Sequence, residues 1–197
     1  MIKKIIIITL GVFGIGIGAA LCIVANFGID PCSTLNLGLS NLLLIPIGTM
    51  MIITNIVIFG FMLLFYRDGI HIGTIISAFG VGISINIFLP IFMNLDATTF
   101  SARIIIAIIG ILVTLISVSL YMSPNMGIAP WDAIGYMVQK FIKGKYGTIR
   151  VVYELLAVAI GILLGAQFGV STIIIAFFLG PAIDYLGSKF KIILKLN

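Results

Sequence analysis

Two ionisable residues, Arg150 and Glu154, stand four positions apart in an otherwise apolar segment, GTIRVVYELLAVAIG at 147–161. Residues four apart share one face of a helix, so the guanidinium and the carboxylate can pair. Charged groups are costly inside a membrane and commonly mark ion pathways, proton relays or binding sites. Asp184, in the last apolar segment, is a third group of this kind. We treat the three as candidates for ion coupling. The alternatives are a neutralised pair that anchors helices, and an Asp184 that is simply solvated at the interface.

The stretch GIAPWD at 127–132 follows GIDPCS at 28–33 by ninety-nine residues. Glycine permits unusual backbone angles and proline donates no backbone hydrogen bond, so Gly-x-x-Pro ends one helix and starts another. Ser33 and Asp132 follow the two prolines at equivalent positions, and we expect them to cap short helices. Such a helix N-terminus inside a protein attracts an anionic or electron-rich group.

The short helices that follow these motifs are expected at 33–44 and 131–142, about a dozen residues each, which is too short to cross a bilayer. Two placements remain open at this stage. The segments can be re-entrant, with their first turns against protein or a water-filled cavity. They can also be amphipathic helices that lie on the membrane surface.

Aromatic and neutral polar residues complete the candidate site. Trp131, the only tryptophan, is either a marker of the membrane interface or a surface on which a substrate stacks. Asn55 occupies the position in the first half that Glu154 occupies in the second. The candidate substrate-binding residues are Gly28, Pro31, Ser33, Asn55, Gly127, Pro130, Trp131, Asp132, Tyr136 and Tyr153. No catalytic residue, metal ligand or cofactor is expected, because the sequence shows no nucleophile–base pair, zinc spacing or nucleotide-binding loop.

The composition indicates an integral membrane protein. Of the 197 residues, 61% are apolar and 9% are charged, whereas a soluble domain carries roughly 25% charged residues. Segments long enough to cross a bilayer as helices occur at 5–25, 48–66, 74–92, 104–122, 147–165 and 171–188. We therefore expect an all-α polytopic membrane protein with six transmembrane helices.

The distribution of basic residues predicts an orientation. With the N-terminus in the cytoplasm, nine Lys or Arg residues lie at inner ends and loops, and only Arg103 lies outside. This bias follows the positive-inside rule, so both termini are expected to be cytoplasmic.

The ninety-nine-residue offset extends well beyond the motif. It pairs residues 4–66 with 103–165 without a gap, including Asn26 with Asn125 and Gly48 with Gly147, and becomes ninety-eight for the third spans. Three spans are an odd number, so the second half must enter the membrane from the opposite side. The sequence therefore predicts one membrane domain of two inverted repeats, 1–99 and 100–197, as in many secondary transporters.

The motif at 127–132, the short helix after it and GKYGT at 144–148 resemble the YczE/YyaS/YitT group of bacterial membrane proteins. The likeness covers essentially the whole chain. The first motif copy departs from it, since Cys32 and Ser33 stand where the second has Trp and Asp. The resemblance implies a multi-pass protein of the bacterial plasma membrane and brings no substrate with it.

These observations favour a small secondary transporter rather than an enzyme. It would move a small polar or anionic solute by alternating access. Glu154 would couple transport to protons, and Arg150 would tune the charge of Glu154 or bind an anion. One alternative is a substrate-binding membrane subunit, like the S components that require an ATPase module. Another is a membrane adaptor that transports nothing. The expected partners are lipid and a small-molecule solute, without nucleic acid.

Gly14, Gly16 and Gly18 permit close helix approach, within the monomer or in a homodimer.

Overall fold

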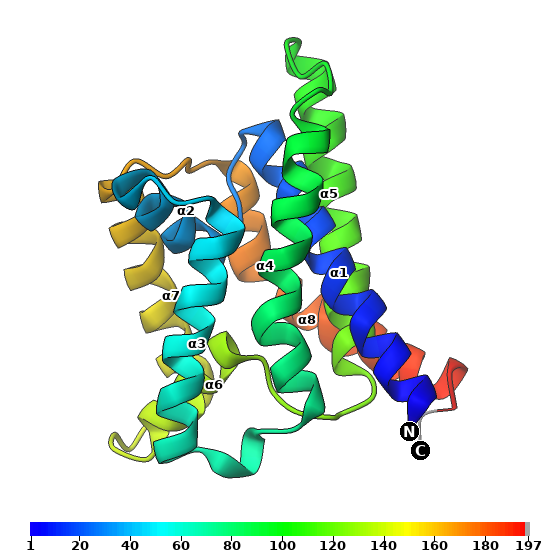
Figure 1. Cartoon of the computed structure of the whole chain (residues 1–197), viewed down its shortest axis with the longest axis vertical. Helices are drawn as coiled ribbons and strands as arrows, with labels where there is room; N and C mark the ends of the chain where they lie inside the picture. Colours follow the sequence, from blue (N-terminus) through cyan, green and yellow to red (C-terminus); the bar gives the residue numbers. More distant parts are fainter. Residues whose placement is uncertain (196–197) are drawn as a thin grey trace.

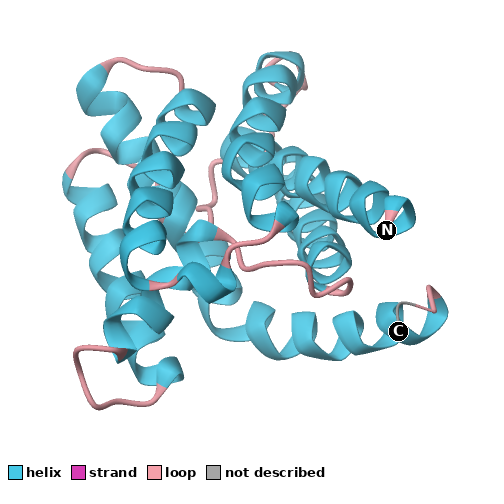
Figure 2. Ribbon diagram, turned by 60° about the horizontal axis from the view of Figure 1, so that its bottom comes forward, coloured by secondary structure: helices cyan, strands magenta, loops and turns pink. Residues whose placement is uncertain are grey.

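The computed structural model describes residues 1–195, leaving out the side chains of residues 176–181 and 184 (Figure 1). Every regular element of this part is helical (Figure 2). In chain order the elements are α1 (Ile2–Ala25), α2 (Pro31–Leu43), α3 (Ile47–Phe65), the 3-10 turn η1 (Arg67–Gly69), α4 (Ile72–Phe92), α5 (Phe100–Met122), α6 (Pro130–Gln139), α7 (Tyr146–Leu163) and α8 (Val170–Ile193). A helix therefore lies at the position of each expected span and short helix, with ends that differ by a few residues.

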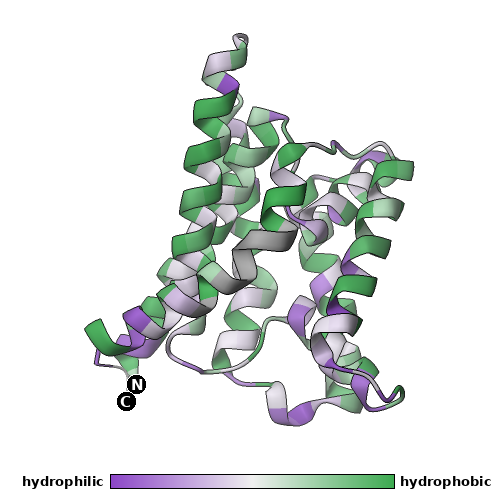
Figure 3. Cartoon of the chain, turned by 180° about the vertical axis from the view of Figure 1, so that it is seen from behind, coloured by the Kyte–Doolittle hydropathy of each residue, from purple (hydrophilic) through white to green (hydrophobic). Residues whose placement is uncertain are grey.

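The long helices have the length and hydropathy of membrane spans. Among the described residues, α1, α3, α4, α5 and α7 qualify, and α8 is a helix of 24 residues. Large apolar side chains lie exposed along these helices, and hydrophilic residues gather largely at the two ends of the molecule (Figure 3). In water such a surface would be strongly unfavourable, so the chain is an all-α polytopic membrane protein, as its sequence predicts.

The two Gly-Ile-x-Pro motifs form matching breaks between helices. Asn26 and Asn125 both adopt left-handed backbone conformations, with φ of 53° and 50°. Gly28 and Gly127 follow with φ of 102° and 114°, a region that side chains disfavour. Proline then occupies the first turn of α2 and of α6.

The expected helix caps are corrected by the structure. The N-cap of α2 is Asp30, whose Oδ1 accepts a hydrogen bond from the backbone N–H of Ser33 at 3.0 Å. In α6 the N-cap is Ala129, and no side chain caps it. Asp132 is the third residue of α6 and lies in the first turn of that helix. The caps were misplaced because each helix begins at its proline rather than after it.

Helices α1 and α5 pack antiparallel through small residues. A Cβ on Gly11, early in α1, would overlap the backbone of Ser117 and Tyr121, late in α5. A Cβ on Gly110, early in α5, would lie against Cys22, late in α1. The two contacts are related by the ninety-nine-residue offset, as the interface between inverted halves requires. Gly14 and Gly18 also face α5, and Gly16 faces α4, so these three glycines contact helices of the same chain.

The halves are also joined by reciprocal contacts at the helix breaks. The backbone N–H of Gly73, in the first half, donates to the carbonyl of Met126 at 2.9 Å. The equivalent N–H of Ser171 donates to the carbonyl of Phe27 at 3.1 Å. In addition, α2 packs against α7, and α6 against α3. The short helix α2 thus packs mainly against a long helix of the other half, whereas α6 packs about equally against α3 of the other half and α7 of its own.

Gly127→Ala should destabilise the protein, because its positive φ and the adjacent Thr74 leave no room for a methyl group. A left-handed conformation costs an L-residue about 1–2 kcal/mol, so we expect an apparent melting midpoint in detergent lower by about 2–8 °C. Gly60→Ala is the matched control, because no heavy atom of the described residues lies within 4 Å of its Cβ position in α3. Equal midpoints for the two variants would contradict this account of the turn.

Candidate functional site

A cavity of about 390 Å³ lies where the two short helices begin. Its lining includes both members of several residue pairs related by the repeat offset: Asp30 and Ala129, Pro31 and Pro130, Cys32 and Trp131, Ser33 and Asp132, Met51 and Arg150, Asn55 and Glu154, and Ile15 and Thr114. Both halves therefore contribute equivalent residues to the cavity, and neither half forms it alone.

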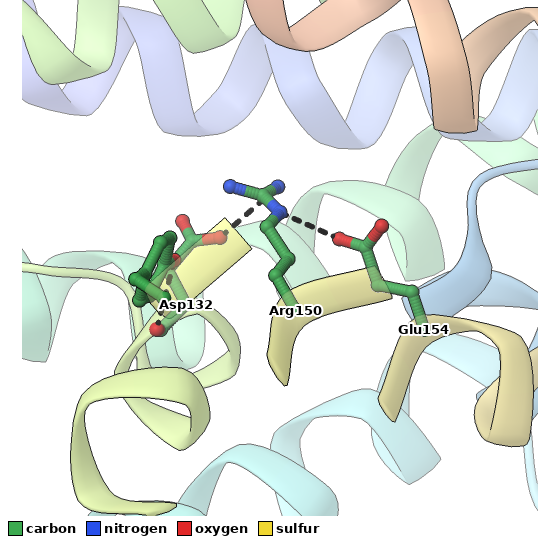
Figure 4. A network of polar contacts seen from close by, with 4 residues as sticks. Asp132, Arg150 and Glu154 are labelled. Carbon is green, nitrogen blue, oxygen red and sulfur yellow. Dashed lines mark hydrogen bonds and ion pairs between the residues drawn. The ribbon is translucent and has the colours of Figure 1, made fainter. Parts of the chain in front are cut away.

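Three charged side chains form a chain of ion pairs along one wall (Figure 4). The Nε of Arg150 donates to Oε1 of Glu154 at 2.8 Å. A terminal nitrogen of Arg150 lies 3.4 Å from Oδ1 of Asp132. The side chains of Arg150, Asp132 and Glu154 are 40%, 26% and 13% exposed. One guanidinium is thus shared by two carboxylates, so the pairing expected between Arg150 and Glu154 extends to the second motif.

Backbone and aromatic contacts hold Asp132 and its neighbour in place. The hydroxyl of Tyr146 donates to the carbonyl of Asp132 at 3.3 Å. Trp131 lines the cavity and packs edge-to-face on Tyr153, with ring centroids 5.7 Å apart. Tyr153 therefore supports Trp131 from outside the cavity lining.

The first-half wall carries an acid and two polar side chains. Asp30 caps α2 through its Oδ1 and also lines the cavity, next to Cys32 and Ser33. Asn55, only 6% exposed, donates from Nδ2 to the carbonyl of Ala78 at 3.2 Å. That carbonyl fixes the amide orientation, because only the NH₂ end can donate. The Oδ1 of Asn55 has no donor among the described residues.

The structure places the candidate residues in three groups. Those that line the cavity are Pro31, Ser33, Asn55, Pro130, Trp131, Asp132, Arg150 and Glu154. Gly28 and Gly127 shape the turns that lead into it. Tyr136 lies elsewhere, stacked between Tyr66 and Tyr146 with centroids 5.4 and 4.4 Å away. The side chain of Asp184 falls outside the described residues.

Sequence reasoning missed several lining residues, including Asp30, Ser77, Thr114 and Tyr121. Asp30 occupies the x position of Gly-Ile-x-Pro in the first motif. An acidic residue next to the expected site could therefore have been recognised from the sequence. The other three are polar residues in long apolar segments and are buried in the structure. Hydropathy alone does not tell which face of a helix points inward, so these three required the tertiary structure.

Fold and cavity together define a small α-helical polytopic membrane protein with an internal polar cavity between its halves. The model of the family described as a family of unknown function (DUF6198) matches residues 2–188. The chain belongs to that family. Comparisons with curated proteins and with solved structures found no match.

The shared guanidinium should couple its two carboxylates energetically. Arg150→Met leaves Asp132 and Glu154 facing one another without a cation, which is unfavourable in an apolar setting. Adding Glu154→Gln removes one of the two stranded charges. We expect the double variant to be less destabilised than the sum of the single variants, by about 1 kcal/mol or about 2–4 °C in the melting midpoint. Additive effects would show that the pairs contribute nothing to stability.

Proposed function

We propose that this protein is a small secondary transporter of the bacterial plasma membrane that moves a small polar solute by alternating access. In this proposal the cavity between the halves is the solute site, and Glu154 and Arg150 supply ion coupling. Both termini are assigned to the cytoplasm, and the protein is related to the YczE/YyaS/YitT group. Glu154 carries the exchangeable proton, and Arg150 tunes its affinity.

One observation carries the proposal. Two motifs ninety-nine residues apart bring their short helices to a single cavity, and equivalent residues of both halves line it. Transporters with inverted repeats place interrupted helices and their solute site at this kind of junction. A volume of about 390 Å³ suits a small organic molecule, since ligand pockets span roughly 300–1,000 Å³.

The packing of the first half supports alternating access. In the first half α3 packs closely on α4, where Gly48 faces Gly82 and Nδ2 of Asn86 donates to the Thr49 hydroxyl at 2.9 Å. By the repeat offset, the residues that correspond to Gly82 and Asn86 are 180 and 184, whose side chains lie outside the described residues. Equivalent positions in inverted halves lie toward opposite ends of the molecule. In this proposal the end beside α3 is closed, and exchanging this arrangement for a closed arrangement beside α7 switches the open side.

The charge distribution assigns a side to each end. Both termini lie at the end of the molecule that carries η1 and the lysine-rich 140–145 loop (Figure 1). At that end the Nζ of Lys3 donates to the Leu194 carbonyl at 2.7 Å. The positive-inside rule makes this the cytoplasmic end. The close contact between α3 and α4 at Gly48 lies toward the other end, so we assign the structure to a state that is closed to the outside and opens inward.

The thiol of Cys32 offers a direct test, because it lines the cavity. In a Cys22→Ala background, a membrane-impermeant methanethiosulfonate should modify Cys32 in both right-side-out and everted vesicles, since alternating access exposes the site to each face in turn. Mass spectrometry of the labelled protein measures the reaction, and a Cys22→Ala/Cys32→Ser protein serves as the blank. Reaction from one face only would contradict transport and favour a receptor or adaptor.

Gly147→Val should separate alternating access from an open pore. Among the described residues no heavy atom lies within 4 Å of a Cβ at position 147, but a valine would clash if α7 closed on α8 as α3 closes on α4. A clash of about 1.4 kcal/mol shifts a two-state equilibrium tenfold. We therefore expect modification of Cys32 from the outer face to slow by about tenfold, with inner-face modification and melting midpoint preserved. Equal slowing from both faces would indicate damage to the fold, and no slowing would contradict the two-state switch.

A further inference from the structure

We infer that the solute is a small organic cation, with an ammonium or guanidinium group at the acidic wall of the cavity and an apolar body against the opposite wall. This inference rests on the proposed function and adds the chemical class of its substrate. It differs from the anionic solute that sequence reasoning left open.

The charge balance of the cavity is the first observation. Its described lining contains the carboxyl groups of Asp30, Asp132 and Glu154 and a single cationic side chain, Arg150. Arg150 is already engaged by Asp132 and Glu154, while no described cation lies within pairing distance of Asp30. Ionised, this lining carries two more negative charges than positive. Such an excess at membrane depth is unfavourable until a cation or protons enter.

The two helix N-termini at the cavity do not reverse this balance. Each terminus is equivalent to about half a positive charge, so together they offset about one unit. The protein's own acids also occupy the positions where an anion would bind. Asp30 accepts the free N–H of Ser33 at the start of α2, and Asp132 lies in the first turn of α6. An anionic solute would compete with these carboxylates and be repelled by them.

The hydrogen-bonding groups of the cavity lining also favour a cationic solute, on grounds other than net charge. Asn55 is more than nine-tenths buried, lines the cavity and presents an Oδ1 for which the described residues supply no donor. The carboxylates of Asp30 and Glu154 each have one oxygen without a described hydrogen bond. Each of these oxygens can accept a hydrogen bond from a solute. Ammonium and guanidinium groups donate hydrogen bonds and accept none, so they suit a wall of surplus acceptors.

The rest of the lining suits an organic body rather than a bare ion. Apolar side chains from six long helices face the cavity: Ile15, Met51, Val81, Val118, Val151, Ile175 and Ile183. Trp131 lies beside Asp132 at the acidic wall, where an indole face attracts cations. The cavity volume leaves room for an apolar group next to the charged head.

Three probes of nearly equal size and different charge test the inference: phenethylammonium, phenethyl alcohol and phenylpropionate. Each is added to the purified Cys22→Ala protein in detergent, and protection of Cys32 from a methanethiosulfonate is measured at increasing concentration. We expect phenethylammonium to protect at concentrations at least about tenfold lower than the other two. Protection by phenylpropionate at equal or lower concentration, or by all three alike, would overturn the cationic class while leaving the cavity as a binding site.

Asp30→Asn sharpens the test, because asparagine also caps helices well and keeps α2 intact. The half-protecting concentration of phenethylammonium should rise by about tenfold in this variant, with an unchanged melting midpoint. Asp96→Asn, in an exposed loop, is the matched control and should have no effect. An unchanged concentration in Asp30→Asn, or no protection by any probe, would overturn the inference. The transport proposal is tested separately, by whether Cys32 is modified from both faces of the membrane when no probe is present.

Discussion

The fold depends on one constraint: backbone polar groups at membrane depth must be satisfied inside the protein. Each Gly-Ile-x-Pro break follows the end of a long helix and contains carbonyls that no helix supplies with a donor. The other half donates to one carbonyl in each break, to Phe27 through the Ser171 N–H and to Met126 through the Gly73 N–H. These reciprocal hydrogen bonds join the halves at the points where the two short helices begin.

Close packing of α1 on α5 permits this reciprocal bonding. Without water, helix association in a membrane relies on van der Waals contact and close backbone approach. Gly11 and Gly110 provide that approach at two sites related by the repeat. The antiparallel pair joins the two halves, and α2 and α6 each contact a long helix of the opposite half. The cavity lies between the first turns of these short helices and the long helices around them.

On this near-symmetric frame the charged groups are unevenly distributed. The second half contributes Asp132, Arg150 and Glu154, whereas the equivalent first-half residues are neutral, and the first half adds its acid at Asp30. In the proposed transport cycle, a symmetric backbone with asymmetric chemistry would allow the two open states to have similar energies while solute and protons meet one set of charges. The same asymmetry produces the surplus of acceptors and negative charge from which we infer a cationic solute.

The sequence by itself determined the helix inventory, the ninety-nine-residue repeat and the Arg150–Glu154 pair, because hydropathy, glycine and proline positions and i,i+4 spacing act locally. It also identified both motifs as site elements, although it placed their caps at Ser33 and Asp132. Only the tertiary structure decided that Asp132 shares Arg150, that Asp30 faces the same space, and that Tyr136 and Tyr153 lie outside it. The relation between Asp30 and Asp132 joins segments about a hundred residues apart, and that between Asp132 and Arg150 joins two different helices. They depend on which face of each helix turns inward, and in a uniformly apolar helix only packing against its neighbours decides that.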